Sequence, residues 1–263
     1  MATQETTKKR KLQESDAATD AALRKKQKRQ QKKKQLRQKY AQGETDLDLE
    51  AGLNRAFERM DGQLLADHLA QKTRRFGADL SPVELADLYI SANAIKDTTS
   101  WDQPRSLENL PAFLEKFARP NEKLDEAPSK NGSPHTLIVS AAGLRAADLV
   151  RAVRKFQKKG SPVAKLFAKH FKLEEQVSFL QKYRTGIAVG TPQRLIDLIE
   201  NDALSLQYLK RLVVDASHID QKKRGIMDMR ETMMPLAKLL CIRDLKERYM
   251  DEKDNWHVDL LFY

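Results

Sequence analysis

The chain has 263 residues, of which 32% are charged, a formal net charge of +11 at pH 7 and one cysteine, Cys241. This length suffices for one sizeable domain plus an extension. A single cysteine excludes an internal disulfide and a thiolate zinc site, which implies a reducing compartment. The sequence holds neither a signal-peptide pattern at its start nor a run of about 18 apolar residues, so we expect a soluble intracellular protein.

Almost all of the net charge lies in an N-terminal arm, residues 1–39, which holds 14 Lys or Arg against 4 Asp or Glu, whereas the remainder holds 34 against 33. Two basic clusters with a milder spacer suit a two-part nuclear import signal and contact with phosphates. The alternative is a solvated tail that only keeps the protein soluble. We expect a basic, disordered tail over residues 1–45, in which nucleic acid is bound by Lys8, Lys9, Arg10, Lys11, Arg24, Lys25, Lys26, Lys28, Arg29, Lys32, Lys33 and Lys34.

Residues 46–134 carry helical patterns followed by a linker. Apolar residues recur at helical spacing from Asp46 to Arg75, with a break signal near Asp61-Gly62. Ser81, followed by Pro82 and then Glu84, predicts a capping box at a helix start. We therefore expect one or two amphipathic helices within 46–75, a helix over 82–90, a short helix over 111–117 and a surface linker over 119–134.

Residues 135–263 alternate short β-like runs with helical patterns, as parallel βαβ units do. We expect strands over 135–139, 163–169, 186–189, 209–215 and 257–262, and helices over 144–157, 173–183, 193–200 and 229–240. Five parallel strands with helices on both faces predict an α/β fold: a three-layer, doubly wound, mainly parallel sheet.

Two motifs in this half resemble the first RecA-like domain of DEAD-box RNA helicases. Ile187–Leu195, which contains Gly190-Thr191-Pro192, is similar to their Gly-Thr-Pro-Gly-Arg motif, and Leu212–His218 resembles the strand that bears the Asp-Glu-Ala-Asp box. The resemblance implies a single degenerate RecA-like domain over 135–263, after the helical extension and linker of 46–134.

The departures from the helicase pattern concern the ATP chemistry. The sequence has no Gly-x-x-x-x-Gly-Lys-Ser/Thr phosphate loop, and we expect no second RecA-like domain. Asp215 remains, but Ala216 stands where helicases have the Glu that prepares the attacking water, and His218 replaces the last Asp. We therefore predict no catalytic residues, no cofactor and no metal site, and thus a protein that is not an enzyme. We interpret Asp215 as a carboxylate that caps a turn or pairs with a basic neighbour.

Thr191 and Arg194 lie, by the same resemblance, where helicases hold the RNA backbone. Thr191 can cap a helix that begins at Pro192 and leave its amides facing a phosphate, so both residues are candidate RNA contacts. The alternative is a simple helix cap and a surface arginine, because Gln193 stands in place of the helicase Gly.

Several separate motifs, in order from about Leu47 to the C-terminus, resemble the Cms-one family: Asp79-Leu80-Ser81-Pro82, Leu107–Leu114, Leu166–Phe171 and Gly190-Thr191-Pro192. That family is associated with the small-subunit processome, the 90S pre-ribosome that contains the U-three small nucleolar RNA. The resemblance implies a nuclear and nucleolar factor in early 18S pre-rRNA maturation. Its implied partners are pre-rRNA or U-three small nucleolar RNA and other assembly proteins.

Three functions remain open at this point. The first is a non-catalytic scaffold or RNA-binding subunit of the pre-ribosome. The second is an RNA-stimulated ATPase, which would need the missing phosphate loop. The third is a chromatin or DNA-associated nuclear protein that uses the same arm, because Lys and Arg neutralise phosphates regardless of base sequence. We expect a monomer within a large particle, with no membrane or small-molecule partner.

Overall fold

Runs of β-branched and aliphatic residues form the strands of a central sheet. The computed structural model describes residues 46–169, 171–250 and 256–263, and from Leu47 onward they form one compact unit. The strands are β3 (Thr136–Val139), β4 (Ala164–Leu166), β5 (Ile187–Gly190), β6 (Arg211–Val214) and β7 (Asp259–Phe262). They are all parallel, in the order β4-β5-β3-β6-β7.

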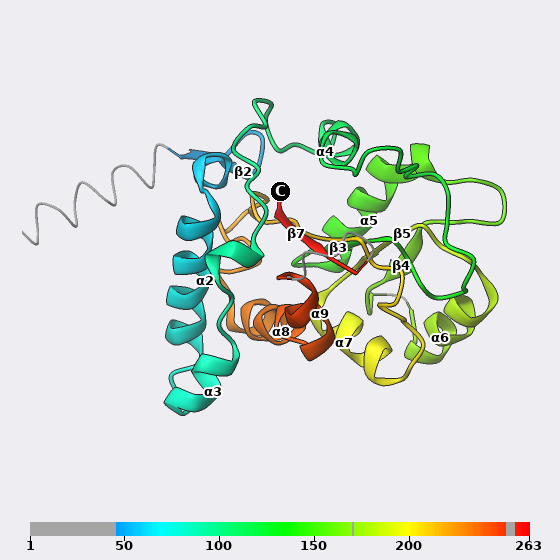
Figure 1. Cartoon of the computed structure of the whole chain (residues 1–263). Helices are drawn as coiled ribbons and strands as arrows, with labels where there is room; N and C mark the ends of the chain where they lie inside the picture. The colour runs from blue at the N-terminus through cyan, green and yellow to red at the C-terminus, as the bar shows by residue number, and fades with distance from the viewer. Residues whose placement is uncertain (1–45, 170, 251–255) are drawn as a thin grey trace, which may run out of the picture. The chain divides into compact units, whose positions relative to one another are not determined.

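Both faces of this sheet are covered by helices, so every residue of its strands β3 and β5 is buried. Leu137 and Val139 of β3 face one hydrophobic cluster, while Ile138 between them faces the other. Figure 1 shows α4 and α5 on one side of the sheet and α7, α8 and α9 on the opposite side. The helices are α2 (Gly62–Phe76), α3 (Pro82–Asp87), α4 (Leu110–Lys116), α5 (Gly143–Ala152), α6 (Leu173–Lys182), α7 (Pro192–Glu200), α8 (Arg230–Leu240) and α9 (Arg243–Arg248). The predicted three-layer, mainly parallel α/β fold is confirmed.

Of the one or two helices expected within residues 46–75, α2 forms, and no α-helix forms before it in the described residues. A two-stranded antiparallel hairpin stands there, formed by β1 (Leu47–Asp48) and β2 (Leu53–Asn54) and followed by the 3₁₀ helix η1 (Arg55–Arg59). The Asp48 carboxylate accepts from the Ala51 amide at 3.0 Å, and this local bond favours a turn over a helix. The break near residue 61 is confirmed, since the Asp61 side chain accepts from the Leu64 amide at 2.9 Å and α2 begins at Gly62.

The residues before β3 contact the central sheet and its loops at two places. The Asn54 amide donates to the Ser217 carbonyl at 2.7 Å, and the Ile219 amide donates to the Gly52 carbonyl at 2.9 Å, so the hairpin lies against the loop after β6. Ile95 forms a parallel bridge with Leu260 on the outer side of β7. Residues 46–134 thus share the hydrophobic core with the sheet; a domain boundary at residue 134 stays a prediction.

Several element ends differ from expectation. The capping box is confirmed, because Ser81 Oγ accepts from the Glu84 amide and Glu84 Oε2 accepts from the Ser81 amide, but α3 ends at Asp87. Strand β4 is shorter than predicted. Two further elements, α9 and the 3₁₀ helix η2 (Ala92–Ala94), were not predicted. Within the described residues, no helix is long and apolar enough to cross a membrane.

Candidate nucleic-acid interface

Asp215, at the carboxyl end of β6, is held by Arg145 of α5. Arg145 Nε donates to Asp215 Oδ2 and Arg145 Nη2 donates to Asp215 Oδ1, both at 2.9 Å. Asp215 is only 2% exposed, so this two-pronged pair is shielded from water. The predicted pairing of Asp215 with a basic neighbour is confirmed. Within the residues that the structure describes, no group of three His, Cys, Asp or Glu is placed to hold a metal ion.

Other buried groups close this end of the sheet around the pair. Arg105 is fully buried and donates to the Phe262 carbonyl at 2.6 Å and to Thr98 Oγ1 at 3.0 Å. Desolvation lowers the pKa of Arg105 to about 10. Desolvation, together with the positive charge of Arg145, also lowers the pKa of His218 below its ordinary value. With the hairpin lying over the loop after β6, the carboxyl end of β6 is filled by protein side chains.

Thr191 is the N-cap residue of α7, which begins at Pro192 as predicted, but its side chain makes no capping hydrogen bond. Backbone bonds hold the turn instead: the Thr191 amide donates to the Leu166 carbonyl at 3.2 Å, and the Thr191 carbonyl accepts from the Leu195 amide at 3.0 Å. Pro192 at the first helical position has no N–H that needs a cap. RNA contact by Thr191 stays a prediction.

Arg194 is not the surface arginine of the alternative interpretation, because its side chain is only 12% exposed. Its Nη1 donates to Gln176 Oε1 at 2.7 Å and to the Phe171 carbonyl at 3.2 Å, and both partners belong to α6 or the residues just before it. The guanidinium therefore joins α7 to α6. Its contact with RNA stays a prediction, as do the contacts of the twelve basic arm residues, which lie outside the described residues.

The sequence contains a second basic region. It is hidden when charges are summed over all residues after the arm, because that sum is close to zero. Residues 149–173 contain eight Lys or Arg and no Asp or Glu. In the fold this segment runs from the middle of α5 through η3 (Val153–Phe156) and β4 to the start of α6, beside a cavity of about 650 Å³. A count of charges in short windows would have found it.

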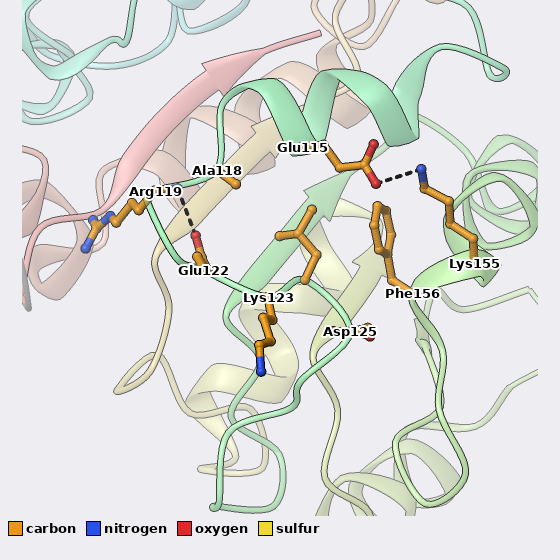
Figure 2. Close-up of a pocket in the computed structure, with 9 residues that line it drawn as sticks. Glu115, Ala118, Arg119, Glu122, Lys123, Asp125, Lys155 and Phe156 are labelled. Carbon is orange, nitrogen blue, oxygen red and sulfur yellow. Dashed lines mark hydrogen bonds and ion pairs between the residues drawn. The ribbon is translucent and has the colours of Figure 1, made fainter.

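A second cavity, of about 560 Å³, differs in its charges. Figure 2 shows Glu115 directed toward Lys155, at 2.8 Å between the carboxylate and Nζ, and Glu122 directed toward the Arg119 amide, at 3.2 Å. Glu122 also pairs with the fully buried Arg211. Acidic and basic groups alternate around this cavity, so it offers no concentrated positive charge to a polyanion.

Comparison with known proteins extends these observations. The family model CMS1, described as "U3-containing 90S pre-ribosomal complex subunit", matches residues 3–263. Protein CMS1 of Chaetomium thermophilum is 72% identical over 257 residues, which are 98% of this chain and 97% of that protein. Human Protein CMSS1 is 33% identical over 179 residues, which are 68% of this chain and 59% of the human protein. This chain thus spans less than two thirds of the human relative.

Among solved structures, the DEAD-box splicing factor Prp28 of yeast is similar at a TM-score of 0.37 and 19% identity. The match covers 53% of this chain and 31% of that chain.

Proposed function

Because this chain belongs to the CMS1 family of U3-containing 90S pre-ribosomal complex subunits, we propose that it acts in that particle as a non-catalytic scaffold that binds RNA. The resemblance to the Cms-one family noted in the sequence motifs is confirmed. We propose a nucleolar location and contacts with pre-rRNA or U3 RNA and with other assembly proteins. The observation that carries the non-catalytic role is the buried Arg145–Asp215 pair.

A catalytic carboxylate must be free to bind a metal ion or a water molecule. Both carboxylate oxygens of Asp215 instead accept hydrogen bonds from Arg145, and the methyl side chain of Ala216 beside it cannot transfer a proton. We therefore expect the purified chain to hydrolyse no ATP, with or without RNA. The measurement is phosphate release with structured RNA present, for the intact chain and for Asp215→Ala. RNA-stimulated release that Asp215→Ala abolishes would contradict the non-catalytic role.

RNA binding is supported first by the basic arm, which carries nearly all of the net charge. Each neutralised duplex phosphate contributes about 0.9 to the slope of log affinity against log salt, so an arm that engages about six phosphates gives a steep dependence. Binding of a structured RNA is measured from low to physiological salt. We expect removal of residues 1–39 to flatten the slope, and the double variant Thr191→Ala/Arg194→Ala to change it much less.

Two results would contradict this assignment. If the chain without residues 1–39 keeps the full slope while the Thr191/Arg194 double variant loses it, the RNA site lies on the folded body and not on the arm. If crosslinking followed by sequencing recovers chromosomal DNA in place of pre-rRNA and U3 RNA, the arm serves a chromatin protein.

A further inference from the structure

The larger of the two cavities is a groove at the β4 edge of the sheet, which we call the β4 groove. It has a volume of about 650 Å³. The α5–η3 segment forms one wall, β4 forms the floor and α6 forms the other wall. Its lining residues are Val150, Arg154, Gln157, Pro162, Val163, Lys165, Phe171, Glu175, Gln176 and Phe179.

The charge of the groove is positive and is not neutralised within it. Arg154 and Lys165 are exposed, and in the part of the chain that the structure describes no carboxylate forms an ion pair with either. The single acidic lining residue, Glu175, uses its Oε2 to accept the Lys172 backbone amide at 3.1 Å. Further exposed lysines of the same chain segment stand at positions 159, 169 and 172. An occupant with several negative charges therefore gains most from this surface.

The groove also offers aromatic surface to its occupant. Phe171 and Phe179 are partly exposed lining residues. Each ring is held by a neighbour: Phe171 packs edge-on against Phe167 with ring centroids 5.6 Å apart, and Phe179 lies 5.1 Å from the ring of Tyr183. Rings held in place lose little entropy when a base stacks on them. Positive charge interleaved with aromatic rings is typical of sites for single-stranded nucleic acid.

Backbone carbonyls on the floor of the groove already accept hydrogen bonds from a side chain. Gln176 Nε2 donates to the Lys165 carbonyl at 2.7 Å and to the Phe167 carbonyl at 3.1 Å. Gln176 Oε1 in turn accepts from Arg194 Nη1. The carbonyl of Lys165 in edge strand β4 and that of Phe167 just after it are therefore engaged, which disfavours the addition of a peptide to this edge as a paired strand. This argues against an extended protein segment as the occupant and in favour of RNA.

We propose that the β4 groove binds single-stranded RNA, with an unpaired base against Phe171 and Phe179 and the adjoining phosphates at Arg154 and Lys165. The proposal rests on the proposed function and deepens it, because it adds a site on the folded body to the arm. Arg194 is a positioning residue in this arrangement, since it holds Gln176 and the Phe171 carbonyl from behind the groove.

The test uses the full chain and two probes, a fluorescent single-stranded RNA and a duplex that contains the same strand. The groove variant is Arg154→Ala/Lys165→Ala, and the matched control is Lys222→Ala/Lys238→Ala, which removes two exposed charges elsewhere. We expect the groove variant to weaken single-strand binding about tenfold beyond the control, whereas duplex binding falls equally in both.

Phe179 supplies a second readout that does not depend on charge. We expect Phe179→Leu to weaken single-strand binding about fivefold or more, because leucine fills the site without a π face, and Phe179→Tyr to retain it. Thermal unfolding of both variants shows whether the fold is intact. Crosslinking with 4-thiouridine RNA should recover peptides that contain Phe171 or Phe179.

Each other outcome separates the two proposals. If the intact chain binds RNA and the groove variant matches the control on both probes, the β4 groove is not an RNA site and the arm alone carries binding. If the intact chain binds neither probe, the proposed function itself is wrong. If a glutamate-rich peptide binds and is lost in the groove variant while RNA is retained, the groove holds an acidic protein segment and the proposal is overturned.

Discussion

Arg145 and Asp215 are joined by two hydrogen bonds of 2.9 Å each, in a pair whose side chains are 9% and 2% exposed. Removing one partner leaves the other charge buried without compensation, which costs about 3–5 kcal/mol. We therefore expect Arg145→Ala to lower the free energy of unfolding by about that amount. Urea unfolding followed by circular dichroism measures the change.

Two controls accompany this prediction. The double variant Arg145→Met/Asp215→Leu removes both charges together and should be more stable than Arg145→Ala alone. Arg243→Ala breaks an ion pair whose side chains are 88% and 61% exposed, and it should change the free energy of unfolding very little. An Arg145→Ala protein as stable as the Arg243→Ala protein would show that the buried pair contributes nothing.

A second prediction concerns the stability of the fold in mild acid. Desolvation, together with the positive charge of Arg211, lowers the pKa of His135 from its ordinary 6.5 to about 4. In the unfolded chain His135 binds a proton near pH 6.5, whereas in the folded chain it binds one only near pH 4. The contribution of His135 is thus complete above pH 6.5 and is lost as the pH falls toward 4, by on the order of 3 kcal/mol at most.

The measurement is the free energy of unfolding between pH 7 and pH 4 for the chain and for His135→Gln. The variant should show a shallower fall over this interval. Desolvation and the Lys72 charge also lower the pKa of His68 to about 4, so part of the slope should remain until His68→Gln is added. Identical slopes for the chain and the double variant would contradict the assignment to these histidines.

A third prediction concerns Gln176, which is 3% exposed and bonds to β4 through its amide nitrogen and to Arg194 through its oxygen. Gln176→Met keeps the side-chain length but leaves two carbonyls and a guanidinium without these partners. Each buried unsatisfied group costs about 1–3 kcal/mol. We expect a loss of at least about 2 kcal/mol in urea unfolding, against almost none for Gln181→Met, which is exposed on the same helix.

A fourth prediction concerns the arm. Residues 1–39 supply charge and only four large apolar side chains, Met1, Leu12, Leu23 and Leu36, so their removal should leave a body that unfolds cooperatively, with a melting temperature close to that of the intact chain. Differential scanning calorimetry of the two proteins makes the comparison. If the truncated chain loses its cooperative transition, the arm is part of the folded structure.

The sheet and most of its helices could be predicted because their signals are local. Residues 187–190 and 212–214 are short apolar runs, and the helices between strands show regular apolar spacing. The N-terminal hairpin could not be predicted in this way, since its backbone partners Ser217 and Ile219 lie far along the chain. Its sequence has apolar residues at helical spacing, but the hydrogen bonds to these distant residues favour the hairpin over a helix.

The candidate sites show the same limit. A carboxylate at the end of a buried strand is expected to pair with a basic side chain, so the pairing of Asp215 could be predicted. Its partner could not, because Arg145 lies 70 positions away in the sequence. The β4 groove was missed for another reason. The charge of residues 40–263 nearly cancels, 34 Lys or Arg against 33 Asp or Glu, and this balance concealed a segment without a single acid.

The outer edge of β7 is covered by residues that come much earlier in the chain. The Leu260 carbonyl accepts from the Lys96 amide at 2.9 Å, and the Phe262 carbonyl accepts from Arg105, 157 positions away. Such contacts form only after a long loop has closed, which slows folding. Until they form, β7 presents a bare strand edge that another chain can pair with, so aggregation competes with folding at this edge before the segment around Lys96 and Arg105 reaches it.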